Sequence, residues 1–109
     1  MRKTDEYYIE EILKNINFIL EHMRGITKEA LESNAVLTDS MTFRLVHISE
    51  LSKSLTDEYK AAHPDIPWSD ITALRNRLVH DYGNIDMTIV YDTLTKDVVE
   101  LKDRLSNLY

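Results

Sequence analysis

Apolar residues recur at helical spacing along most of this chain. The first such stripe consists of Ile9, Ile12, Leu13, Ile16, Ile19, Leu20 and Met23. Recurrence at i, i+3, i+4 and i+7 places side chains on one face of a helix. The pattern predicts a helix from about Asp5 to Met23, followed by Gly25, which can adopt the left-handed conformation that often ends a helix.

Two further helices are expected between Gly25 and Pro64. Thr27 can cap a short helical segment that runs through Leu31. A longer helix should run to about Ala62, where Pro64 ends it because the residue before a proline is disfavoured in the α region. The candidate caps of this helix are Thr38, Asp39 and Ser40. Its apolar face consists of Met41, Leu45, Ile48, Leu51, Leu55 and Tyr59.

The C-terminal half predicts two more helices. Pro67 suits the first turn of the earlier one, where a missing N–H costs no hydrogen bond. Its apolar stripe is Trp68, Ile71, Leu74, Leu78 and Val79. Gly83 and Asn84 break this helix, and Asp86 can cap the last one. The last helix has apolar positions at Met87, Val90, Tyr91, Leu94, Val98, Leu101, Leu105 and Leu108.

These elements predict one all-α domain over residues 1–109. The chain is long enough for a single hydrophobic core, and no segment has the alternating pattern of a strand. Two glycines and two prolines provide little turn chemistry, which favours long uninterrupted elements. We therefore expect an up-and-down bundle of four or five helices with short connections.

Composition narrows the functional classes. The chain has no cysteine, which excludes disulfides, thiolate zinc sites and cysteine nucleophiles. No apolar run approaches the roughly 20 residues of a membrane-spanning helix, so we expect a cytoplasmic protein without a membrane association. The net charge of −6 disfavours a protein that holds nucleic acid through its overall field. Binding to RNA would depend on a few placed cations, or on two chains that combine theirs.

One short segment carries an unusual set of chemical groups. Arg75, Asn76, His80 and Tyr82 fall within eight residues near the end of the third long helix. A guanidinium binds phosphate through a planar fork of donors, and an imidazole exchanges protons near neutral pH. This combination suggests chemistry on a phosphodiester. The alternative is structural, because arginine and histidine in the last turns of a helix also complement its dipole.

The spacing within this segment constrains the geometry of a site. Arg75 and Tyr82 are seven residues apart and therefore lie on nearly the same face of an ideal helix. His80 follows Arg75 by five residues, which rotates it by about 140° around the axis. The two groups can converge only through a distorted last turn or a second copy of the helix. The spacing thus favours a homodimer.

The other histidines offer weaker candidates. His22 and His63 lie at helix ends, where a solvated, dipole-complementing role is the simpler interpretation. His47 precedes Glu50 by three residues and is interpreted as part of a surface pair. No second pair of ligands is near in sequence, so no metal site and no cofactor are expected. Trp68 is interpreted as an anchor beside the proline turn.

The chain resembles the HepT-like branch of the HEPN superfamily, the toxins of HEPN/minimal-nucleotidyltransferase toxin–antitoxin pairs. The resemblance rests on residues 63–68, Ile71, residues 75–82 and residues 85–86, and extends upstream through residues 48–51. It implies an all-α bundle that dimerises, with two Arg-x4-His motifs lining a shared cleft. The implied activity is metal-independent cleavage of RNA that leaves 2′,3′-cyclic phosphate and 5′-hydroxyl ends.

The resemblance also implies roles for individual residues. His80 would move a proton to or from a reacting oxygen, and Arg75 would stabilise charge on the phosphoryl oxygens. Asn76 would orient the phosphate or the imidazole. Tyr82 resembles the tyrosine to which the partner nucleotidyltransferase, the antitoxin, attaches AMP. Added AMP would block the cleft and repel RNA.

Two departures from the family pattern accompany these matches. Gly83 and Asn84 stand where many relatives have an aromatic residue followed by glycine, and Ser49 replaces a common glycine. A second functional hypothesis is a non-enzymatic subunit that presents a nucleotide or substrate to a nucleotidyltransferase. The strongly acidic composition favours it modestly. A structural helical dimer with a decayed site is the third and least favoured alternative.

Overall fold

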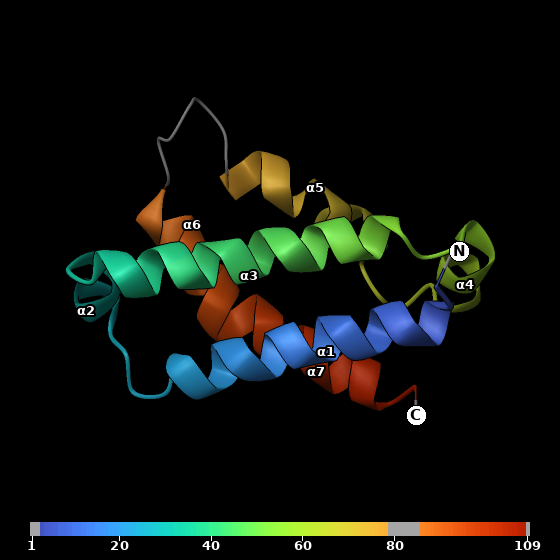
Figure 1. The fold of residues 1–109 in the computed structure, drawn as a ribbon, viewed down its shortest axis with the longest axis horizontal. Coiled ribbons are helices and arrows are strands. Elements are labelled where there is room, and N and C mark those ends of the chain that lie inside the picture. The colour runs from blue at the N-terminus through green and yellow to red at the C-terminus, as the bar shows by residue number, and fades with distance from the viewer. Residues whose placement is uncertain (1–2, 79–85, 109) are drawn as a thin grey trace.

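The computed structural model describes residues 3–78 and 86–108, and every regular element within them is helical. Four helical rods run up and down: α1 (Asp5–His22), α3 (Ala35–Lys53), α5 (Trp68–Leu78) and a final rod formed by α6, η1 and α7 (Figure 1). Two short helices, α2 (Lys28–Glu32) and α4 (Asp57–Ala62), lie at opposite ends of α3. The predicted all-α, up-and-down bundle is confirmed.

Local hydrogen bonds explain where the first helices begin and end. The Thr4 hydroxyl accepts the amide of Tyr7 at the start of α1, and the Thr27 hydroxyl accepts the amide of Ala30 at the start of α2. Between them, Gly25 has a φ of 71°, in the left-handed region. These features agree with the boundaries that the sequence predicts.

The prediction of a long second helix is wrong in both the start and the length of that helix. It begins at Ala35 rather than near residue 39, because the Asn34 side chain accepts the amide of Leu37. It also stops at Lys53, and a separate helix, α4, starts after Thr56. Thr56 caps α4 locally, because its hydroxyl accepts the amide of Tyr59. A tertiary contact adds to this cap, since the Asp5 carboxylate accepts both the amide (2.9 Å) and the hydroxyl (2.7 Å) of Thr56.

The C-terminal rod contains a widened turn that the sequence does not predict. It runs as α6 (Met87–Asp92), the π-helical segment η1 (Thr93–Asp97) and α7 (Val98–Ser106). Asp86 caps α6, as expected, through the amides of the first turn. The hydroxyl of Thr93 donates to the carbonyl of Ile89 and that of Thr95 to Tyr91, so both hydroxyls bond back along the rod. A π-helical segment of this kind widens a helix locally without ending it.

The core lies between the four rods, and α5 packs mainly on α3. Two serines of α3 make this contact close. Ser49 donates from its hydroxyl to the carbonyl of Thr72 on α5 at 2.9 Å, and Ser52 lies within 3.2 Å of the Thr72 hydroxyl. Both serines are fully buried. Trp68 anchors the start of α5 by donating from its indole to the carbonyl of His63 at 3.0 Å, as expected.

Candidate functional site

The structure places Arg75 and Asn76 on the last turns of α5, with both side chains exposed. The buried stripe of α5 consists of Trp68, Ile71, Leu74 and Leu78 and fixes which face of the helix meets α3. Arg75 lies at the edge of this stripe and Asn76 on its far side. The Arg75 side chain retains 48% of its accessible surface. A guanidinium at this position is held by a packed helix and remains open to a ligand.

Glu50 of α3 is the acidic neighbour of Arg75. Its Oε1 lies 3.5 Å from Nε of Arg75 and 3.6 Å from Nζ of Lys53. Because Glu50 and Arg75 are both about half exposed, the pair is worth at most about 1 kcal/mol of stability. The contact uses the inner nitrogen of the guanidinium. The sequence interpretation instead paired Glu50 with His47. Glu50 and Arg75 are 25 residues apart, so no local pattern predicts their contact.

The remaining two site residues, His80 and Tyr82, lie outside the described residues. The convergence of Arg75 with His80, the homodimer and the exposure of Tyr82 therefore stay predictions. Among residues 3–78 and 86–108, no three His, Asp or Glu side chains gather closely enough to hold a metal ion.

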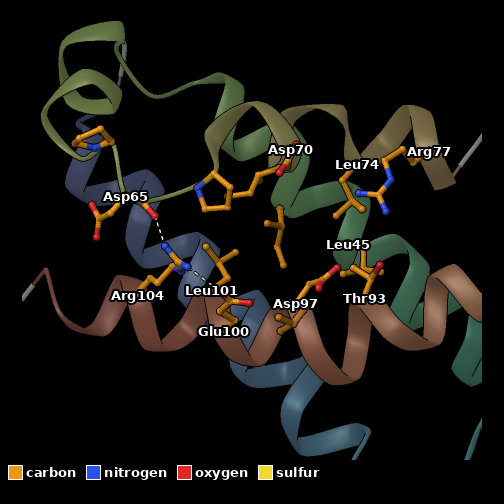
Figure 2. A pocket seen from close by; sticks show the side chains of 15 residues that line it. Leu45, Asp65, Asp70, Leu74, Arg77, Thr93, Asp97, Glu100, Leu101 and Arg104 are labelled. Atoms are coloured by element: carbon orange, nitrogen blue, oxygen red, sulfur yellow. Dashed lines mark hydrogen bonds and ion pairs between the residues drawn. The ribbon is translucent and has the colours of Figure 1, made fainter.

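A separate cavity of about 430 Å³ opens on the other side of α5, between α5 and the C-terminal rod. Figure 2 shows Asp70 and Arg77 on α5, across from Asp97 and Glu100 on η1 and α7. The floor is apolar and includes Leu45, Ile48, Ile71, Leu74, Val98 and Leu101. Arg75 and Asn76 do not line it.

The charges around this cavity are predominantly acidic. Asp65, Asp70, Asp97 and Glu100 line it together with Arg77 and Arg104. Arg104 already donates to the Asp65 carbonyl and pairs with Glu100 at 2.8 Å. An apolar floor below mostly acidic side chains disfavours a phosphodiester. The cavity is therefore not the site that the Arg75 segment predicts.

The other histidines have contacts of a structural kind. The imidazole of His22 stacks on Phe18, with ring centroids 3.9 Å apart, and its Nδ1 lies 2.8 Å from the Phe18 carbonyl. His47 is parallel to the exposed ring of Phe43, with centroids 5.8 Å apart. His63 lies against the ring of Tyr59.

Comparison with known families settles the relationship that the motif suggests. Residues 12–108 match the model of the family described as "Ribonuclease HepT-like". The chain belongs to the HepT-like family. The match extends from within α1 to the end of the C-terminal rod and so covers every described helix except the first part of α1.

Named relatives of this HepT-like chain agree over nearly full length. A protein of Caldanaerobacter subterraneus subsp. tengcongensis, named as a candidate RNase, is 31% identical over 97% of this chain and 95% of its own. A protein of Thermococcus cleftensis named "Probable ribonuclease HepT" is 29% identical over 99% of this chain and 98% of its own. No solved structure matches this chain significantly. No helix within the described residues is long and apolar enough to cross a membrane.

Proposed function

We propose that this HepT-like protein is an endoribonuclease that cleaves RNA without a metal ion. The observation that carries the proposal is the exposed guanidinium of Arg75, held on a packed helix within a chain that belongs to this family. The names of its relatives, which refer to RNase activity, support the same reaction class.

The reaction uses the RNA's own 2′-hydroxyl as the nucleophile. The 2′-oxygen forms a bond to the adjacent phosphorus while the bond from phosphorus to the 5′-oxygen breaks. One proton leaves the 2′-oxygen and one is given to the 5′-oxygen, so the products carry a 2′,3′-cyclic phosphate and a 5′-hydroxyl. His80 moves one of these protons, and a homodimer would bring a second imidazole for the other.

Arg75 stabilises the charge that gathers on the phosphoryl oxygens. The contact with Glu50 is compatible with this role because it involves Nε, at 3.5 Å, and not the terminal nitrogens. The terminal nitrogens can then form a fork toward phosphate. Asn76, on the same exposed turn, orients the phosphate or the imidazole.

A cleavage assay with matched arginine variants tests the proposal. Purified protein is incubated with single-stranded RNA in EDTA, and the product ends are identified by mass spectrometry. His80→Ala should abolish cleavage, and Arg75→Ala should slow it by about 10²–10³-fold, as for loss of an oxyanion donor. Arg77→Ala, which removes an arginine from the other side of α5, should cleave like the wild type. Equal activity of wild type and His80→Ala would exclude the assigned role of His80.

The same proposal includes regulation by a partner. Expressed alone, the protein should act as a toxin and arrest growth, and a cognate minimal nucleotidyltransferase should neutralise it by transferring AMP to the Tyr82 hydroxyl. Intact-mass measurement after incubation with the partner and ATP should show added AMP on the wild type and none on Tyr82→Phe. AMP on both proteins would place the modification elsewhere.

A second function is favoured by one observation, the net charge of −6. In this alternative the chain is a non-enzymatic subunit that binds phosphate through Arg75 and His80 within a nucleotidyltransferase complex. It predicts a tight complex, no growth arrest by the chain alone and no cyclic-phosphate product. The cleavage assay above separates the two functions.

A further inference from the structure

A second pocket, shallow and open to solvent, lies between the C-terminal end of α3, α4 and α5. It is on the opposite side of α5 from the acidic cavity of Figure 2, and the two share no lining residue. Lys53 of α3 and Lys60 of α4 line the pocket. Asp57 is its acidic lining residue among those described.

Polar groups of α5 form the other wall of this pocket. Ser69, Thr72 and Asn76 recur at intervals of three and four residues and so lie along one side of the helix. From Ser69 to Asn76 this side extends for about 10 Å along the helix axis. Ala73 and Trp68 supply the apolar part of the lining. Two ammonium groups opposite hydroxyls and an amide are donors suited to phosphate and ribose oxygens.

The pocket is continuous with the candidate cleavage site. Asn76 lines the pocket and directly follows Arg75 in the exposed motif. Lys53 of α3 and Arg75 of α5 both lie within 4 Å of the same carboxylate oxygen of Glu50. The cations of the pocket and the guanidinium of the site are thus parts of one local surface.

The charge of this surface differs from that of the whole chain. Counting the pocket together with Glu50 and Arg75, three cations accompany two carboxylates, whereas the protein as a whole carries −6. For an acidic protein to hold RNA, a few placed cations must compensate for long-range repulsion. This pocket adjoins the motif, and its described lining has more cations than carboxylates.

We propose that this pocket holds the sugar–phosphate backbone of single-stranded RNA beside the scissile phosphate, with Lys53 and Lys60 as its phosphate ligands. The proposal rests on the ribonuclease function proposed above and names where the flanking substrate lies. Lys53 and Lys60 determine affinity in this arrangement, whereas Arg75 and His80 act on the reacting phosphate.

The consequence is a defined salt dependence. Each phosphate contact on a single strand contributes about 0.7 to the slope of log affinity against log salt. Lys53→Gln with Lys60→Gln should therefore reduce the slope by about 1.4 and weaken binding by about 25-fold at 0.1 M salt. Asp57→Asn should strengthen binding, because it removes the carboxylate that opposes phosphate in the pocket.

The test measures binding of a fluorescent 2′-O-methyl RNA, which lacks the nucleophile and is not cleaved, across a series of salt concentrations. The matched control is Lys14→Gln with Lys96→Gln, which changes net charge equally at two exposed lysines outside the pocket. A parallel assay with cleavable RNA should show a raised KM and a nearly unchanged kcat for the pocket variant. Light scattering and circular dichroism establish its oligomeric state and fold.

Three results would overturn the proposal. If the pocket and control variants bind alike while the wild type cleaves RNA, the pocket assignment fails and the ribonuclease function stands. If the wild type neither binds nor cleaves RNA, the proposed function fails and the pocket proposal falls with it. If the pocket variant loses an oligomer that the wild type forms, the pocket is an interface between copies of the chain.

Discussion

The contact between α3 and α5 holds the helix that carries Arg75. Its contribution to stability can be tested by substitutions at Ser49. Ser49→Ala removes one buried hydrogen bond, 2.9 Å from hydroxyl to the Thr72 carbonyl, with almost no change in volume. A neutral hydrogen bond of this kind contributes about 1 kcal/mol net. The Thr72 carbonyl also accepts within the helical hydrogen-bond pattern of α5. Removal of the Ser49 hydroxyl therefore leaves this carbonyl with a partner. We therefore expect about 1 kcal/mol of destabilisation and no more.

The matched control is Ser33→Ala. Its hydroxyl also donates to one backbone carbonyl, that of Ala30 at 3.1 Å, but on an exposed turn. An exposed serine of this kind should change stability by less than about 0.5 kcal/mol. A third variant, Ser49→Leu, inserts a large side chain where no accessible surface remains. Overpacking adds about 1–3 kcal/mol to the cost and should lower cleavage by displacing α5.

Urea unfolding followed by circular dichroism measures these effects. With a slope of about 1–3 kcal/mol per molar urea, Ser49→Ala should lower the midpoint by about 0.3–1 M at an unchanged slope. Ser33→Ala should shift the midpoint by less than about half as much. Equal midpoints for Ser49→Ala and Ser33→Ala would refute the argument that the buried bond stabilises the interface. A Ser49→Leu variant as stable as the wild type would refute the close packing of α3 on α5.

Three further changes test other parts of the fold by thermal unfolding. Gly25→Ala should cost about 1 kcal/mol of stability, because alanine is strained at a φ of 71°. No atom lies within 4 Å of the added methyl group, so this cost comes from the backbone alone, and an unchanged midpoint would exclude it. Asp86→Ala should cost about 1 kcal/mol through loss of the α6 cap, whereas Asp86→Asn should retain most of it; equal loss in both would exclude capping as the cause. Trp68→Phe should cost at least about 1 kcal/mol, because the carbonyl of His63 loses the indole donor, and a neutral outcome would show that water replaces it.

The sequence singles out candidate site residues but not the residues that surround them. Arg75 and Asn76 stand out because their chemistry and spacing are visible along the chain, and the structure places both on an exposed helix face. Lys53 and Lys60 gave no such signal, and Glu50 entered only through the resemblance of residues 48–51 and its spacing from His47, without a link to Arg75. They come from two other helices, and only packing brings them to α5.

The sequence by itself determined the features that depend on neighbouring residues. Helix faces follow from apolar periodicity, and the starts of α2 and α6 follow from the side chains of Thr27 and Asp86, which satisfy amides within the next turn. The tertiary structure decided the rest. Thr56 caps α4 locally, but Asp5 also binds it from 51 residues away, and the surroundings of Arg75 depend on α3. These contacts join groups that are distant along the chain, so no local pattern records them, and folding alone brings them together.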